Sequence, residues 1–287
     1  MQARRAVAGA KARLAVLRRR AAGLARVWLI LGLSAVAAVC TVSEEEERVL
    51  GEYEAAQVDS LLPLVDDTVI TRFVTELGRA LTATTSRADL DWRFTVVNTA
   101  EVNAFALPGG FIYVTRGLIE TVDRFDQLAG VMGHEIGHVA LRHSVEQLER
   151  SAQRDVALIL LCTLTRACDT RGRVVAVQVG ADALTAQYSQ HDEAEADSLS
   201  VLITTRAGID PEGIAAFFEL LLAQQTEQPT RIEAFFSTHP TDQARIRAVR
   251  RQIAALGQLP AALVRDTPEF HAVRARLGAM PAPPETE

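Results

Sequence analysis

The segment His134-Glu135-Ile136-Gly137-His138 combines residue types that can bind a metal ion and move a proton. Residues four apart lie on the same face of an α-helix, so His134 and His138 can both bind one ion. Glu135 lies next to that face and can accept a proton from water bound to the metal. Zinc suits this chemistry because three protein ligands leave one coordination position open, and because zinc lowers the pKa of a bound water to about 7. The segment therefore predicts a hydrolytic site with one Zn²⁺ per chain and Glu135 as general base.

An accidental match on a surface helix is the alternative interpretation. The helix that carries the segment has apolar residues on one stripe, which indicates that it packs against a core. These residues are Leu128, Val131, Met132, Ile136 and Val139.

A third metal ligand is expected on a second helix. A third histidine six residues after the second does not occur, because that position is Ser144. His143 would point about 140° away from His138 on a continuous helix, which predicts only a capping or surface contact for it. Glu193 and Asp197 share a helix face, so Glu193 can bind the metal and Asp197 can accept a hydrogen bond from the far nitrogen of a ligand imidazole. Taken alone, the acidic run around them is typical of a solvated helix face.

Four motifs occur in a characteristic order along the chain. They are Asn-Ala-Phe-Ala-Leu-Pro-Gly-Gly at 103–110, His-Glu-Ile-Gly-His at 134–138, Glu-x-x-Ala-Asp at 193–197 and Ser-Thr-His-Pro at 237–240. Together they resemble the HtpX/CAAX-prenyl-protease (Ste-type) family of zinc metallopeptidases, the gluzincins, and most closely its soluble periplasmic BepA/LoiP-like members. The resemblance covers about residues 44 to 256. It implies a zinc endopeptidase with the roles already given to His134, His138, Glu193, Glu135 and Asp197.

The resemblance assigns roles to two further residues. His239 matches a histidine in a loop near the metal, which in some family members occupies the open coordination position of the resting enzyme. Arg245 matches an arginine near the same loop, where it could stabilise the oxyanion of a tetrahedral intermediate. The alternatives are a turn residue before Pro240 for His239, which the motif makes the weaker interpretation, and a solvated helix position for Arg245, which is about as well supported as the functional role.

The elements that must position these residues are mainly helices. Apolar residues at helical spacing predict helices over 44–85, with a restart capped by Asp66-Asp67, and over 124–150, 152–166, 175–207, 211–225 and 241–256. Short β-branched and aromatic runs at 92–97 and 111–114 flank a Pro-Gly-Gly turn, which predicts two or three antiparallel strands. The expected fold is α+β and mainly α, zincin-like, with a small antiparallel β-sheet and an active-site helix.

The sequence predicts one metallopeptidase domain over residues 43–258. A C-terminal extension with a disordered tail is expected over 259–287. Residues 145–185 are a candidate lid over the cleft. Within that segment, Cys162 and Cys168 are either a disulfide or two small core residues.

Residues 1–42 are expected to be an export signal. The first 26 residues hold eight basic side chains and no acidic one, and an uncharged apolar run of sixteen residues follows. The run is shorter than the about 20 residues of a typical membrane-spanning helix, and small residues near its end are typical of a signal peptide. An uncleaved anchor and a lipid on Cys40 are the alternatives, and either would associate the protein with a membrane. All three predict a location in the bacterial cell envelope, in the periplasm.

The charge of the remaining chain argues against a nucleic-acid partner. Without the first 26 residues, 22 basic side chains stand against 36 acidic ones. Binding to phosphates needs clustered Lys and Arg, which this balance does not favour.

The expected activity is hydrolysis of peptide bonds in cell-envelope proteins, and the resemblance implies a role in protein quality control. Substrates are expected to bind as an extended strand near Asn103 and Ala104. A membrane-embedded protease is disfavoured because no later apolar run is long enough to span a bilayer. A catalytically latent, chaperone-like or binding module with the same fold is the other alternative, but it predicts a broken metal set, whereas all the candidate ligands are present.

Overall fold

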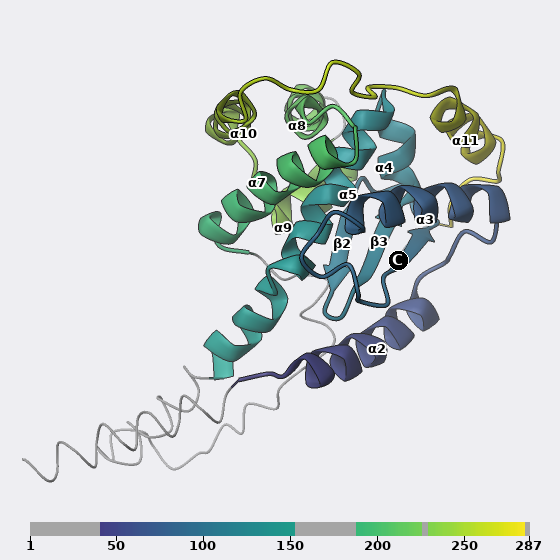
Figure 1. The fold of residues 1–287 in the computed structure, drawn as a ribbon. Coiled ribbons are helices and arrows are strands. Elements are labelled where there is room, and N and C mark those ends of the chain that lie inside the picture. Colours follow the sequence, from purple (N-terminus) through teal and green to yellow (C-terminus); the bar gives the residue numbers. More distant parts are fainter. Residues whose placement is uncertain (1–40, 153–187, 226–228, 285–287) are drawn as a thin grey trace, which may run out of the picture. The chain divides into compact units, whose positions relative to one another are not determined.

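The computed structural model describes residues 41–152, 188–225 and 229–284 (Figure 1). The chain divides into two compact units, one of Met1–Val42 with Leu148–Arg173 and the other of Ser43–Gln147 with Val174–Glu287. Of the first unit, only 41–42 and 148–152 are described, and 148–152 are helical. The predictions for the export signal, for Cys40, for the pair Cys162 and Cys168, for the helix over 152–166 and for most of the lid lie outside the described residues.

The second unit contains a three-stranded sheet with the order β1-β3-β2. β1 (Arg93–Val97) pairs parallel with β3 (Phe111–Thr115), and β2 (Ala104–Leu107) pairs antiparallel with β3. The predicted fold class is confirmed, but the sheet is mixed rather than antiparallel throughout. The three strands alternate in direction along the chain and β3 lies in the middle, so β1 and β3 run the same way.

The turn between β2 and β3 depends on its two glycines. Gly109 and Gly110 have φ values of 78° and 107°, a region that residues with a Cβ rarely adopt. The Pro-Gly-Gly segment therefore reverses the chain at the position that the sequence predicts.

Two helices precede the sheet. α2 (Glu44–Leu61) begins at a capping box between Ser43 and Glu46, and α3 (Thr68–Thr82) is capped by Asp67, which accepts hydrogen bonds from two backbone N–H groups. The predicted restart at Thr68 is thereby confirmed. A short helix that was not predicted, α4 (Arg116–Thr121), follows β3 directly.

α5 (Phe125–Ala140) is the central helix of the unit, and fifteen of its sixteen residues are buried. It packs against β2 and β3 on one side and against α7 and α8 on the other (Figure 1). The predicted helix over 124–150 is not continuous, because Arg142 has a φ of 61° and a new helical segment begins at His143. A non-glycine residue in this left-handed region changes the direction of the chain.

The remaining helices are α7 (Gln190–Arg206), α8 (Glu212–Gln224), α9 (Pro229–Thr238), α10 (Gln243–Ala255) and α11 (Pro268–Gly278). The bounds of α8 and α10 agree with the prediction to within two residues, and α7 covers the described part of the predicted 175–207. α9 and α11 were not predicted. Phe270, Val273 and Leu277 of α11 are buried in the same core as α3 and α5, although they belong to the predicted C-terminal extension. No described helix is both long enough and apolar enough to cross a bilayer.

Candidate metal centre

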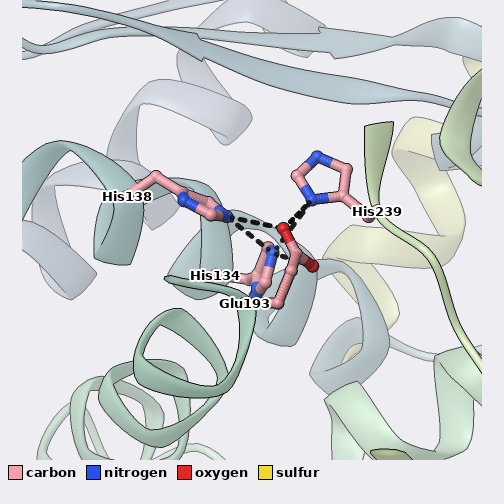
Figure 2. Close-up of side chains that lie close together, drawn as sticks. All are labelled: His134, His138, Glu193 and His239. Carbon is pink, nitrogen blue, oxygen red and sulfur yellow. Dashed lines mark hydrogen bonds and ion pairs between the residues drawn. The ribbon is translucent and has the colours of Figure 1, made fainter. Parts of the chain in front are cut away.

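Four side chains from three segments converge in the interior of the second unit. Figure 2 shows the imidazoles of His134 and His138 on α5 and of His239 after α9 around the carboxylate of Glu193 on α7. Each of the four residues offers one ligand atom, and these four atoms all lie within 4.8 Å of one another. All four residues are buried. The sequence-predicted ligands are thus together, although Glu193 lies 55 positions after His138 along the chain.

The distances define the centre of this cluster. The Nε2 atoms of His134 and His138 are 3.0 Å apart. Glu193 places Oε1 3.3 Å from Nε2 of His138 and Oε2 3.5 Å from Nε2 of His134. His239 places Nδ1 2.9 Å from Oε1 of Glu193 and 3.2 Å from Nε2 of His134.

Small residues let α5 and α7 approach closely enough for this geometry. A Cβ atom on Gly137 would lie 3.1 Å from both Cα and O of Ala196, which is tighter than ordinary packing. Gly137 lies within the His-Glu-x-x-His segment, and Ala196 is the alanine of Glu-x-x-Ala-Asp. The two motifs therefore supply the donors and also the close contact that brings the donors together.

The donor set fits a divalent metal ion. Two imidazole nitrogens and one carboxylate oxygen are a known set of protein ligands for zinc. Two Nε2 atoms 3.0 Å apart compete for a single proton, whereas one cation can satisfy both lone pairs. Both oxygens of Glu135 are buried and accept no hydrogen bond from any described residue. A carboxylate left in this state is available to an ion, a water or a substrate.

Asp197 and Arg245 lie behind the ligand His134. Oδ1 of Asp197 is 2.9 Å from Nδ1 of His134. Arg245 binds Asp197 through two atoms, with Nε 2.8 Å from Oδ2 and Nη2 2.8 Å from Oδ1, and its Nη1 is 2.6 Å from Oε2 of Glu193. The guanidinium also lies over the ring of Phe218, 4.4 Å from its centroid. Asp197 thus lies beside His134, as expected from the sequence. Arg245 contacts two carboxylates, donates from Nη1 to the carbonyl of Pro240, and has Nη2 3.5 Å from Nε2 of His134.

The buried charges shift one another's pKa values. Burial raises the pKa of Glu135, and the nearby imidazoles of His239 and His134 only partly offset this effect. Burial would also raise the pKa of Glu193, but His239, His134 and His138 outweigh it and hold that pKa well below the usual range. Burial lowers the pKa of His138. In His239 burial acts in the same direction, but Glu135 and Glu193 outweigh it and raise the pKa.

Two residues that were not predicted to lie at the site, His143 and Tyr188, contact His138. His143 is 1% exposed, and its Nδ1 is 2.9 Å from Nδ1 of His138, so the expectation of a capping or surface contact is wrong. The expectation assumed a continuous helix, and the chain bends at Arg142 instead. Tyr188 stacks on His138 with ring centroids 3.8 Å apart. It precedes α7, and no motif marks it in the sequence.

The predicted substrate strand would lie beside β2. Among the described residues β2 pairs only with β3, so it forms an edge of the sheet, and it packs against α5. Asn103 stands immediately before β2 and Ala104 is its first residue. Both are therefore at a sheet edge next to the helix that carries His134 and His138.

A mainly helical domain with a small mixed sheet, a buried His-Glu-x-x-His helix and a glutamate donor from a second helix defines a zincin-like metallopeptidase. Residues 69–253 match peptidase family M48, and the chain belongs to this family. The resemblance read from the four motifs is thereby confirmed.

Several relatives of known name are similar to this chain. The beta-barrel assembly-enhancing protease of Escherichia coli (strain K12) is 30% identical over 244 residues, which are 82% of this chain and 49% of the relative. Metalloprotease YcaL of the same strain is 26% identical over 225 residues, covering 78% and 86%. The mitochondrial metalloendopeptidase OMA1 of Schizosaccharomyces pombe is 29% identical over 203 residues, covering 71% and 57%. The chain thus spans about half the length of the first of these relatives.

Proposed function

We propose that this protein is a zinc-dependent endopeptidase that hydrolyses proteins of a bacterial cell envelope. The observation that carries the proposal is the convergence of His134, His138 and Glu193 beside the unpartnered carboxylate of Glu135. Membership of family M48 and the names of the relatives, all proteases or metalloendopeptidases, support the same activity. A latent, chaperone-like module is less well supported, because every donor and the candidate base are in place.

His134, His138 and Glu193 would hold the ion. When bound, zinc supplies Lewis acidity, which lowers the pKa of a coordinated water and polarises a peptide carbonyl. Glu135 accepts the proton of the attacking water and then delivers it to the leaving amine. Its two oxygens make no hydrogen bond to a described residue, and Oε1 lies 3.4 Å from Nε2 of His239.

Asp197 and Arg245 position these groups. Asp197, 2.9 Å from Nδ1 of His134, would accept the proton of that nitrogen and keep Nε2 free for the metal, and Arg245 fixes the carboxylate of Asp197 through two contacts. The resemblance implies an oxyanion role for Arg245, and its Nη2 lies 3.5 Å from Nε2 of His134. Because each of its three nitrogens already contacts a carboxylate, we favour the positioning role for Arg245.

His239 and the edge of β2 shape access to the site. His239 lies within the donor cluster, which supports a role in occupying the open coordination position until substrate arrives. The substrate backbone would add a strand along β2 near Asn103 and Ala104. The E. coli relative is named a beta-barrel assembly-enhancing protease, which supports the proposal that the substrates are cell-envelope proteins. A signal peptide, an anchor within residues 1–42 or a lipid on Cys40 would deliver the enzyme there.

The test is hydrolysis of casein by the purified protein, with and without a chelator, together with the zinc content by mass spectrometry. The Glu135→Gln variant is expected to stay folded and zinc-loaded while its rate falls by about 10²–10⁴-fold, because the general base is lost. Glu76→Gln is the matched control, since this glutamate is exposed on α3 and should leave the rate unchanged. Full activity of Glu135→Gln, or of the chelated wild type, would overturn the proposal.

A further inference from the structure

The two candidate ligand imidazoles have different partners on their outer nitrogens. Nδ1 of His134 faces the carboxylate of Asp197 at 2.9 Å. Nδ1 of His138 faces a third imidazole, that of His143, at the same distance. Each ligand ring thus has a partner at Nδ1. The partner of His134 is a carboxylate, which can only accept a hydrogen bond, whereas the partner of His138 is an imidazole, which can accept or donate one.

The contact between His138 and His143 restricts the protons on both rings. A neutral imidazole carries one N–H and one lone pair. If Nε2 of His138 binds the ion, its proton must be on Nδ1 and is donated to Nδ1 of His143. Nδ1 of His143 is then an acceptor, and the proton of His143 must be on Nε2.

A donor at Nε2 of His143 needs an acceptor, and the structure places two carboxylates there. Nε2 is buried and makes no hydrogen bond to a described residue, but Oε2 of Glu195 is 3.5 Å away. The carboxylate of Asp192 belongs to the same cluster, with all three ligand atoms within 4.8 Å of one another. Asp192 is fixed by the capping box that starts α7, whereas Glu195 is half-exposed and also faces His191.

We infer that His143 is a positioning residue that fixes the tautomer and ring orientation of His138, and that Asp192 and Glu195 fix the tautomer of His143. This inference rests on the proposed zinc site. Two neighbours support a fixed ring: Tyr188 stacks on His138, and the Tyr188 hydroxyl is 2.8 Å from Oγ of Ser144. The bend at Arg142 directly precedes His143, whose ring lies against that of His138 rather than on the far side of a continuous helix.

The same cluster could instead hold a second cation, since it offers one imidazole and two carboxylates. A cation on Nε2 of His143 would move the proton of His143 to Nδ1, where it would face Nδ1 of His138. His138 would then have to carry its proton on Nε2, the atom that is needed for zinc. Because the two ions exclude each other in this way, the geometry favours one ion and a His143 that carries a proton on Nε2.

The first test is the zinc dissociation constant of the metal-free protein, measured by competition with a chromophoric chelator. His143→Leu is expected to weaken zinc binding by about 10–100-fold, the usual effect of removing a partner behind a metal ligand. His143→Gln should recover most of the affinity, because its amide oxygen can accept from His138 and its amide nitrogen can donate to the carboxylates. His271→Leu is the control, since His271 is half-exposed and contacts Asp266 away from the site.

The second test needs no variant. Long-range ¹H–¹⁵N NMR of the zinc-loaded wild type is expected to show His143 with its proton on Nε2. A proton on Nδ1 of His143, two zinc ions per chain, or unchanged affinity in a folded His143→Leu would overturn the inference. Failure of the proposed function gives a different result, because the wild type would then take up no zinc or show no chelator-sensitive hydrolysis.

Discussion

Two buried glutamates of this protein have partners of different kinds. Glu47 on α2 contacts both terminal nitrogens of Arg87, at 2.7 and 3.1 Å, and Nε of Arg142 at 2.8 Å, and it accepts from the backbone N–H of Gly109. Glu193 on α7 lies among three imidazoles and contacts Arg245. Both carboxylates are almost completely removed from water.

The two glutamates differ in whether their partners can donate a hydrogen bond in every protonation state. Arginine stays protonated in proteins and a backbone N–H is permanent, so the charge of Glu47 is compensated under all conditions. Imidazoles present lone pairs as well as protons, and the cluster around Glu193 is fully satisfied only when a cation joins it. A buried acid whose partners are all permanent donors therefore indicates a structural role, whereas one surrounded by several imidazoles indicates a metal site, even when an arginine also contacts it.

The two clusters are also connected along the chain. Arg142, which contacts Glu47, is the residue with positive φ that ends α5, and Arg87 also donates to the carbonyl of Val139 in the last turn of α5. The arginine cluster thus fixes the bend that places His143 behind His138. Structural charge pairing at the end of α5 supports the geometry of the metal centre.

The largest expected effect comes from removing the carboxylate of the metal site. Glu193→Gln should reduce zinc affinity by more than about 100-fold. Even the loss of a residue that only hydrogen-bonds to a metal ligand typically lowers metal affinity by about 10–100-fold. The metal-free protein should also unfold at a lower temperature, because the lowered pKa of Glu193 and its contact with Arg245 mean that the charged carboxylate stabilises the folded state. Chelator competition and thermal unfolding of the metal-free protein measure the two effects. A large loss of stability with normal zinc binding would break the comparison.

The next effect concerns Glu47. Glu47→Gln leaves two arginines without their shared carboxylate and is expected to lower the free energy of unfolding by about 3–5 kcal/mol. The zinc content and the specific activity of the folded fraction should change far less than the free energy of unfolding does. Urea unfolding measures the stability, and Glu52→Gln, at an exposed position of the same helix, serves as the control. Stability equal to that of the control would show that the arginine cluster is not structural.

Local patterns predicted most of the helices and the residues that converge at the candidate metal centre. The spacing of His134 with His138 and of Glu193 with Asp197 follows from helix geometry, which acts within a few residues, whereas the pairing of the two helices came from the order of the motifs. The capping residue Asp67 and the Pro-Gly-Gly turn are local signals as well, and both appear where they were expected.

What could not be predicted depends on contacts between distant segments. The parallel pairing of β1 with β3 follows from the position of β3 in the sheet, which no local pattern specifies. The bend at Arg142 depends on Glu47, 95 residues earlier in the chain, so the role of His143 was missed. Short helices such as α9 and α11 are stabilised by burial in a common core, although α11 also carries local signals that the prediction did not use, the Thr267 cap and Pro268 in its first turn.

A third buried glutamate, Glu54 on α2, sharpens the comparison at a smaller scale. Its Oε2 has no hydrogen-bond partner among the described residues, and burial raises its pKa from 4.5 to about 7. Because this pKa is higher in the folded state than in the unfolded state, the folded state binds more protons between these values. Stability should therefore fall as the pH rises from about 4.5 to about 7, and stay lower above that range.

Glu54→Gln removes the ionisable group and should remove this part of the pH dependence. At pH 8 the variant is expected to be more stable than the wild type by up to about 3 kcal/mol, whereas at pH 4.5 the two should be nearly equal. Urea unfolding across this pH range measures the difference, and Glu52→Gln controls for the loss of a charge on α2. A stability difference between Glu54→Gln and the wild type that does not depend on pH would contradict this prediction. It would mean that burial without a hydrogen-bond partner does not raise the pKa of Glu54.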